Sequence, residues 1–308
     1  MTTPLPQAQK TILKTLAYYQ ALSKLSLTVL EIQKYLRKEK GVSHAYSLFE
    51  IQKELNKLEE YGLVTEQNGF WVLSVSVTNE PGLSVFENRI TNSKYAALKW
   101  KKFAKTGRFL PYIPFIRSVA VTGSTALSNA KEKSDIDVLI TSKGGAIWST
   151  RFLVTTVSLL LKRRRYAKKI ENRLCFNQYL TQDAINLGPE TVDDTVNSIK
   201  IKVWDNKIPA NNEALLSLQP SKILILLKNT VEKILKTLRL DKLFETFIAK
   251  LQIAKIQNNP TDYPKELEQP SLNSANLIFY YPRVKITEKK YKEILSSLRN
   301  PDTIRTHV

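Results

Sequence analysis

The sequence predicts an α+β protein with three parts, over residues 1–80, 81–188 and 189–308. In the first part, apolar residues recur at helical spacing and a hairpin signal follows them. In the second, a buried strand runs into a Gly-Ser turn, and the next strand carries two aspartates. In the third, leucines and lysines recur at helical spacing from residue 221 onwards, which indicates a mainly helical region.

Length and composition are those of a soluble protein with more than one domain. The chain has 308 residues, 43% of them apolar and 24% charged, so each part can bury a core of its own. Its single cysteine, Cys175, excludes an intramolecular disulfide, and the N-terminus lacks the order of a secretory signal. Arg151 interrupts the longest apolar stretch, Ala146 to Leu161, which falls short of the roughly 20 residues of a membrane span. We therefore expect a cytoplasmic protein without a membrane span.

The net charge of +19 lies mainly in the middle of the chain. Residues 81–188 hold nineteen basic against six acidic side chains, a net of +13, whereas residues 1–80 hold +1 and residues 189–308 hold +5. A concentrated positive field attracts polyanions. The middle segment is therefore suited to attract a polyanion, either nucleic acid (RNA or DNA) or a nucleoside triphosphate.

Residues 1–80 are predicted to form three helices and a hairpin. The third helical stripe is the clearest, and its apolar residues lie three or four positions apart: Leu48, Ile51, Leu55 and Leu58. Gly62 follows the stripe, where glycine commonly ends a helix. Asn68-Gly69 then separates two apolar runs, which is the strongest short-range hairpin signal. This order resembles a winged helix-turn-helix.

Charge on the third helix bears on the use of this winged helix. The helix that would enter a DNA groove carries four glutamates against two lysines: Glu50, Glu54, Glu59, Glu60, Lys53 and Lys57. A DNA reader needs positive charge here to neutralise phosphates. The sequence therefore favours a structural or protein-contacting winged helix.

A linker, several helices and one strand are predicted outside the two segments that carry motifs. Residues 79–82, Asn-Glu-Pro-Gly, form the predicted linker, and a helix over 86–105 leads into the middle part. In the last part, one or two amphipathic helices are expected over 221–256, a strand over 276–281 and a helix over 288–298.

A phosphate-binding turn is predicted within Ser118 to Leu127. This stretch reads as a strand, a glycine turn and a helix start. Gly123 lets the backbone approach an anion, Ser124 offers its hydroxyl, and unpaired N–H groups at the helix start point towards the charge. Gly123 and Ser124 are therefore the predicted binders of phosphate.

Eleven residues after Ser124, a predicted strand carries two aspartates, Asp135 and Asp137. Side chains two positions apart in a strand share a face, so these carboxylates project together. They repel each other unless a cation lies between them. Hard oxygen ligands with open positions suit Mg²⁺, or Mn²⁺, shared with substrate phosphates. Asp135 and Asp137 are therefore the predicted metal ligands.

The stretch VAVTGSTALSNAKEKSDIDVLIT resembles the active-site signature of the DNA polymerase β-like nucleotidyltransferase superfamily. The resemblance covers residues 115–185, and the flanking pattern is similar to an uncharacterised subgroup. It implies a mixed sheet flanked by helices, with phosphates held by Gly123-Ser124 and two metal ions held by Asp135 and Asp137 as the catalytic residues. It also implies transfer of a nucleoside monophosphate from a triphosphate such as ATP to a hydroxyl, and the basic middle segment favours a hydroxyl on nucleic acid.

The family pattern includes a third acid on a later strand, here the predicted strand Arg173 to Leu180. Strict alternation groups four residues on its more polar face: Arg173, Cys175, Asn177 and Tyr179. On this face, Asn177 takes the position of the third carboxylate and becomes a predicted cofactor-binding residue. Asparagine offers an oxygen ligand but neither charge nor a general base. Asp183 and Glu171, which flank the strand, are the alternatives.

Two other functions stay open on the sequence. Asn177 favours a catalytically degenerate regulator that binds a nucleotide, and a protein-modifying nucleotidyltransferase would use a Ser, Thr or Tyr hydroxyl as acceptor. The basic run Lys162 to Arg165 fits a grip on phosphates, or the C-terminal end of a helix, whose dipole favours cations. His44 and His307 lie far apart in the sequence, so no zinc site is predicted.

Overall fold

The computed structural model describes residues 5–36, 45–74, 82–166, 169–185, 201–206, 218–257, 276–278, 289, 291–296 and 298. Its contacts divide the chain into two compact units, Met1–Ser93 with Arg283–Val308, and Lys94–Pro282. This division groups residues 189–282 with 94–188, whereas the sequence predicts boundaries at 80 and 188. Those three parts stay a prediction about independent folding. Within the described ranges, no helix combines the length and the apolar character that crossing a membrane requires.

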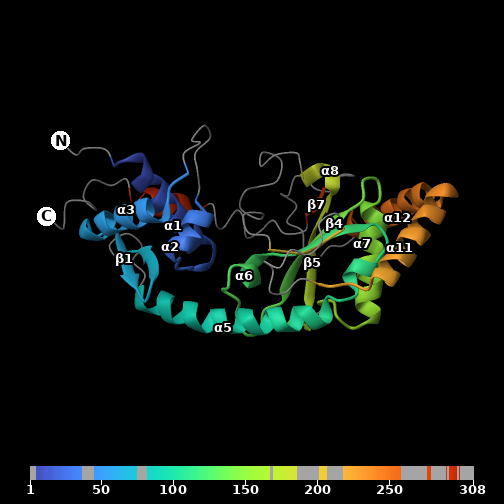
Figure 1. Ribbon diagram of the computed structural model, residues 1–308, viewed down its shortest axis with the longest axis horizontal. Helices are drawn as coiled ribbons and strands as arrows, with labels where there is room; N and C mark the ends of the chain where they lie inside the picture. Colours follow the sequence, from blue (N-terminus) through green and yellow to red (C-terminus); the bar gives the residue numbers. More distant parts are fainter. Residues whose placement is uncertain are drawn as a thin grey trace. The chain divides into compact units, whose positions relative to one another are not determined.

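The first unit contains the helices and the hairpin that the sequence predicted. Helices α1 (Gln7–Ser23), α2 (Val29–Lys34) and α3 (Leu48–Glu60) precede strands β1 (Val64–Gln67) and β2 (Phe70–Leu73), as Figure 1 shows. The two strands pair antiparallel around a turn in which Asn68 and Gly69 have φ of 55° and 80°. Thr28 is the N-cap of α2 and Ser47 is the N-cap of α3, each within a capping box. The class of this unit, a winged helix, stays a prediction.

A five-stranded mixed sheet forms the centre of the second unit (Figure 1). Its strands lie in the order β6 (Ile201–Asp205), β3 (Ile116–Val121), β4 (Ile136–Ser142), β5 (Leu174–Thr181) and β7 (Asn276–Ile278). Only the β4–β5 pair is parallel, and the other three pairs are antiparallel. The sheet is therefore mixed, as the resemblance implied.

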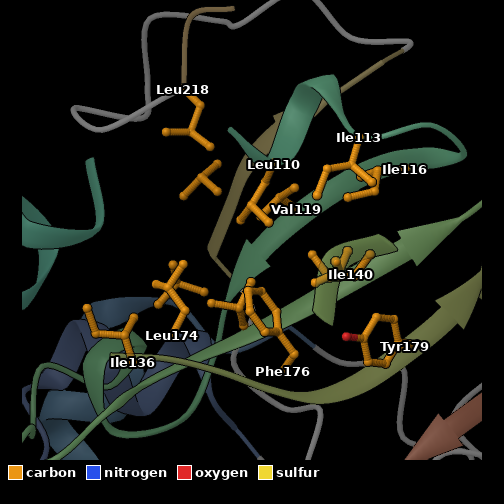
Figure 2. Close-up of a cluster of buried hydrophobic side chains, with 14 of the residues drawn as sticks. Leu110, Ile113, Ile116, Val119, Ile136, Ile140, Leu174, Phe176, Tyr179 and Leu218 are labelled. Atoms are coloured by element: carbon orange, nitrogen blue, oxygen red, sulfur yellow. The ribbon is translucent and has the colours of Figure 1, made fainter. Parts of the chain in front are cut away.

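One hydrophobic core holds the strands in place. Buried residues of β3, β4 and β5, including Ile136 and Phe176, gather with residues of η1 (Leu110–Tyr112) and α7 (Ile147–Leu160) in this cluster, part of which Figure 2 shows. Phe103 of α5 (Gly82–Thr106) belongs to the same cluster and is 0% exposed. The core therefore fixes one face of the strands, while a smaller apolar cluster of Ala120, Leu139 and Leu180 lies on their other face.

Two strands of the C-terminal region complete the sheet. Helices α11 (Lys222–Thr237) and α12 (Leu240–Gln257) lie where helices were predicted, and β7 lies within the predicted strand 276–281. Residues 291–296 are helical, inside the helix predicted over 288–298. Strand β6 was not predicted, because its short sequence Ile-Lys-Val-Trp-Asp gives little signal without its neighbour β3. The described residues of this region are thus mainly helical, but they also supply an edge strand on each side of the sheet.

Helix α11 turns charged residues inwards. Glu232 accepts hydrogen bonds from the Phe115 backbone N–H at 2.6 Å and from Arg117 Nη2 at 2.5 Å. Lys228 Nζ donates to the carbonyl oxygens of Pro111 at 3.2 Å and Ile116 at 2.7 Å. Because buried charges need such partners, these bonds fix the helix against the segment that leads into β3.

Candidate active site

The site is built where β3 ends and β4 begins. The two strands pair antiparallel, and the Thr122 N–H donates to the Asp137 carbonyl oxygen at 3.0 Å, directly after β3. The chain then turns at Gly123, whose φ of 63° favours glycine. A Cβ at this position would collide with Oδ2 of Asp137. The backbone of the predicted phosphate turn therefore lies directly against one of the two predicted metal ligands.

A short helix, α6 (Gly123–Ala126), follows the turn. The Leu127 N–H donates to the Gly123 carbonyl at 3.1 Å, and the Asn129 N–H donates to the Ser124 carbonyl at 2.8 Å. Ser124 itself is only partly buried. These bonds fix the backbone of Ser124 within the turn.

The two aspartates follow the alternation expected of a strand. Asp135 and Asp137 are partly exposed, whereas Ile136 is 0% and Val138 is 1% exposed in the core. The carboxylates therefore leave the sheet on the face opposite the core. The structure brings together the two side chains that the sequence singled out, while their role as metal ligands stays a prediction.

A third side chain joins them, and it is a cysteine. Cys175 pairs with Asp137 in the parallel β4–β5 ladder. Its sulfur and a carboxylate oxygen from each of Asp135 and Asp137 lie within 4.8 Å of one another. Burial, followed by the charges of Asp135 and Asp137, raises the pKa of the Cys175 thiol well above its usual range. Without a cation, the thiol is therefore neutral at physiological pH.

An irregularity in β5 follows Cys175, at the position where alternation favoured Asn177 as the third ligand. The ladder pairs Asp137 with Cys175 and Leu139 with Gln178, so β5 contains one residue more than β4 between these pairs. Such a bulge breaks the strict alternation used to assign the faces of β5. Phe176 and Tyr179 accordingly share the core, although alternation put them on opposite faces.

The bulge also bears on the other candidates for the third ligand. Asn177 lies in it, and its side chain is outside the described part of the chain, so its ligand role stays a prediction. Asp183 lies against Gly144, just beyond the far end of β4. Glu171 accepts a hydrogen bond from Asn172 Nδ2 at 3.1 Å. Among described residues, the acids and thiols that cluster for a metal ion are Asp135, Asp137 and Cys175.

The basic run contributes a cation to the site. Arg165 Nη1 donates to Asp135 Oδ2 at 2.8 Å and lies 3.8 Å from the Cys175 sulfur. Backbone bonds from Arg165 N–H to the Leu174 carbonyl and from Leu174 N–H to the Arg163 carbonyl, both 2.9 Å, hold the run beside β5. Burial lowers the pKa of Arg165, but the charge of Asp135 and the interactions with Cys175 together outweigh this effect, and the net pKa is raised. Arg165 therefore remains charged beside Asp135.

Lys99 supports the site from α5 and was not predicted from the sequence. Its side chain is only 1% exposed, and Nζ donates to the carbonyls of Glu132 at 2.9 Å and Ser134 at 2.7 Å. It also donates to Asn172 Oδ1 at 3.2 Å. Burial lowers the pKa of Lys99, against the opposing charges of Glu171 and Asp135. Lys99 thus ties the loop before β4 to the loop before β5, immediately beside Asp135.

Comparison with known proteins identifies the central segment. Residues 101–210 match the family model of the nucleotidyltransferase domain. No curated protein and no solved structure gave a significant match. The matched range contains Gly123, the aspartate pair, Arg165 and Cys175, and it excludes the helices and the hairpin of the first unit. Residues 101–210 therefore form a nucleotidyltransferase domain of the polymerase β-like superfamily.

Proposed function

We propose that this protein transfers a nucleoside monophosphate from a nucleoside triphosphate to a hydroxyl group on nucleic acid. The observation that carries this proposal is the contact between the Gly123 turn and Asp137, at the point where Asp135 and Arg165 also meet. This contact places groups suited to phosphate beside groups suited to a divalent cation. Both lie within the matched nucleotidyltransferase domain.

The carboxylates of the site fit a divalent cation. Asp135 and Asp137 converge on the face of the sheet opposite the main core, and their negative charges repel each other without a cation. Oxygen ligands of this kind suit Mg²⁺ or Mn²⁺. A cation held by the two aspartates would polarise the phosphate oxygens and make the acceptor hydroxyl a better nucleophile.

The chain's own groups bind and orient the substrates. Backbone N–H groups of the Gly123 turn and the Ser124 hydroxyl would donate to phosphate oxygens. Arg165 offers a guanidinium, which pairs well with phosphate because it donates two parallel hydrogen bonds. In the reaction, the acceptor oxygen bonds to the α-phosphorus, the bond from that phosphorus to the bridging oxygen breaks, and pyrophosphate leaves.

The proton of the acceptor hydroxyl needs a base. Within the described cluster, the carboxylates that can accept it are Asp135 and Asp137, which are also the proposed metal ligands. A dedicated general base typically accelerates such steps by about 100- to 10,000-fold. We therefore expect slow transfer to simple acceptors and faster transfer to an acceptor that the protein positions well.

The charge distribution supports nucleic acid as the acceptor. Residues 81–188 carry nineteen basic against six acidic side chains. Lys162, Arg163 and Lys169, in and next to the basic run, are exposed near Arg165. Exposed cations beside the site would neutralise backbone phosphates of a bound strand.

We also propose that the first unit is a winged helix with a structural or protein-contacting role. On α3, Lys57 forms an ion pair with Glu54 at 2.8 Å, so its charge is largely compensated. Gln9 of α1 also donates to Glu54, at 2.7 Å, which draws this helix face towards α1. These contacts leave α3 with little positive charge for a DNA groove. Lys53→Glu should accordingly leave duplex DNA binding by the full chain unchanged within about twofold.

The proposed reaction is tested with labelled triphosphates. The full chain is incubated with each triphosphate, Mg²⁺ or Mn²⁺, and RNA, DNA or a protein extract, and the labelled product and the released pyrophosphate are identified. Label on nucleic acid, lost in Asp135→Asn and Asp137→Asn, supports the proposal. Label on protein instead would identify a protein-modifying enzyme. Triphosphate binding without release of pyrophosphate would identify a nucleotide-binding regulator.

A further inference from the structure

The potential metal ligands of the candidate site are two carboxylates and one thiol. Asp135 and Asp137 supply hard oxygens, but the third group that approaches them is the Cys175 sulfur. A thiolate is a soft ligand, which Mg²⁺ binds poorly and Zn²⁺ binds well. The chemistry of the third ligand therefore does not match the Mg²⁺ that the two aspartates suggest.

We infer that Cys175 is the third metal ligand and that the site selects a thiophilic divalent cation of the zinc class over Mg²⁺. This inference rests on the proposed function, because it concerns the same site. It assigns a chemical role to a side chain that the alternation of β5 had not singled out. It also specifies which ion the nucleotidyltransferase domain should hold.

Backbone geometry fixes the three groups relative to one another. Asp137 and Cys175 are partners in a parallel ladder, so neighbouring strands present their side chains on one face. Asp135 lies two residues before Asp137 on that face. Core residues Ile136 and Leu174, which are also ladder partners, anchor the same stretch of both strands. Asp137 and Cys175 are therefore fixed by regular sheet structure, and Asp135 directly precedes β4.

The surroundings leave one side of the group open to a substrate. Cys175 is 6% exposed, whereas both aspartates are partly exposed. An ion held there would have a buried sulfur on one side and accessible carboxylates on the other. Catalytic zinc sites commonly keep three protein ligands and one open position, whereas Mg²⁺ requires about six oxygen ligands. A triphosphate oxygen could take the open position.

Arg165 places a positive charge beside the proposed metal ligands. Its guanidinium approaches two of the three proposed ligands, Asp135 at 2.8 Å and the Cys175 sulfur at 3.8 Å. It compensates the carboxylate charge when no ion is bound. An ion would share Asp135 with Arg165 or displace the guanidinium towards the substrate phosphates.

A buried structural thiol is the competing explanation of Cys175. Such a thiol would pack beside the strands without contacting an ion, and serine or alanine would replace it without any change in metal binding. The two explanations differ in one measurable property, the formation of a sulfur–metal bond. Because the chain contains a single cysteine, every sulfur–metal signal from a thiolate reports on Cys175.

The experiment titrates the full chain with Co²⁺, whose thiolate complexes have a strong charge-transfer band in the near ultraviolet. The wild-type protein should develop this band at one equivalent, and Zn²⁺ should abolish it by competition while Mg²⁺ should not. Cys175→Ser should lose the band and bind Zn²⁺ at least about 10-fold more weakly, since even loss of an outer ligand costs about 10- to 100-fold. Cys175→Asp should lose the band but bind Mg²⁺ more tightly than the wild-type protein does.

A second measurement uses the wild-type protein, so it does not require a Cys175 variant to fold. Zn²⁺ should slow alkylation of the wild-type thiol at least about 10-fold, and Mg²⁺ should not, because a metal-bound thiolate is protected. A cobalt complex without the charge-transfer band, or equal alkylation rates with and without Zn²⁺, would overturn the inference. Arg163→Gln is the control variant, because it removes an exposed charge of the same basic run. It should keep the charge-transfer band and the Zn²⁺ protection of the wild-type protein.

Failure of this inference and failure of the proposed function can be told apart. If the sulfur–metal signals are absent but Mg²⁺ supports label transfer, the third ligand is wrong and the enzyme assignment stands. If the signals are present but no cation supports transfer, the metal site stands and the proposed reaction is wrong. Transfer that is faster with Zn²⁺ than with Mg²⁺, together with the signals, supports both.

Discussion

Arg165 donates a hydrogen bond from Nη1 to Oδ2 of Asp135 at 2.8 Å, and this ion pair joins the basic run after α7 to the first residue of the Asp-x-Asp motif. The two residues are thirty positions apart in the sequence. The pair shows that the carboxylate is already compensated by a protein cation. An arriving metal ion would therefore compete with Arg165 for Asp135, and a triphosphate would compete with Asp135 for Arg165.

Replacement of Arg165 by Gln should change metal and triphosphate binding in opposite directions. The variant frees Oδ2 of Asp135, so Mn²⁺ should bind more tightly, while the triphosphate loses a guanidinium partner and should bind more weakly. Arg165 is 37% exposed, so stability should change by less than about 1 kcal/mol. Calorimetric titration measures both affinities, and Arg163→Gln should alter neither metal affinity nor stability. Parallel losses of both affinities would contradict the proposed competition.

Gly123→Ala should impair the site more than an equivalent change elsewhere. The added Cβ would collide with Asp137 Oδ2, and a φ of 63° costs a non-glycine residue about 1–2 kcal/mol. Gly145 provides a matched control, since its φ is 68° and a Cβ there meets nothing within 4 Å. Both variants should lose similar backbone stability, but only Gly123→Ala should also lose metal and triphosphate affinity. Equal affinities in the two variants would show that the contact with Asp137 is unimportant.

Lys99→Met should weaken the site without removing any group from it. The substitution leaves the carbonyl oxygens of Glu132 and Ser134 without their buried donor, which should cost about 1–3 kcal/mol in the free energy of unfolding. Because these carbonyls precede Asp135, metal affinity should fall as well. Lys101→Met, an exposed change on the same helix, is the control. Chemical denaturation and metal titration measure the two effects, and a loss of stability with unchanged metal affinity would make Lys99 purely structural.

Lys228 should make stability depend on alkaline pH. Burial lowers its pKa to about 8, below the ordinary 10.5, although Glu232 opposes the shift. Between these values the unfolded chain binds the proton that the folded chain lacks, so stability rises with pH in this window. Relative to Lys228→Met, the wild-type protein should therefore gain up to about 3 kcal/mol from pH 8 to 10.5. Lys236→Met, an exposed change on α11, should leave the pH profile unaltered. A flat difference between wild type and Lys228→Met would refute the lowered pKa.

Local patterns in the sequence were sufficient for the parts of the fold and site that depend on neighbouring residues. The Gly123 turn could be predicted because a left-handed residue between a strand and a helix favours glycine. The common face of Asp135 and Asp137 follows from the two-residue period around Ile136. The third helix could likewise be predicted from the spacing of its apolar residues, and the hairpin from the Asn68-Gly69 turn.

Tertiary structure decided the groups that depend on partners far along the chain. Alternation put Phe176 and Tyr179 on opposite faces, but the bulge in β5 places both in the core. Only the register against β4 shows that Cys175 faces Asp137, since a one-residue shift between strands changes which side chains meet. Lys99 becomes part of the site through two loops that no pattern on α5 reveals.

Helix α11 shows the same limit most clearly. Its sequence is amphipathic, and a helix normally buries its apolar stripe. Here Lys228 and Glu232 are the buried positions, whereas Leu226 is 66% exposed. Periodicity predicts that a helix has an apolar and a polar face, but which face is buried depends on the surface that the helix packs against. The partners of Lys228 and Glu232 are carbonyl, N–H and guanidinium groups around Phe115, and only folding brings these groups to α11.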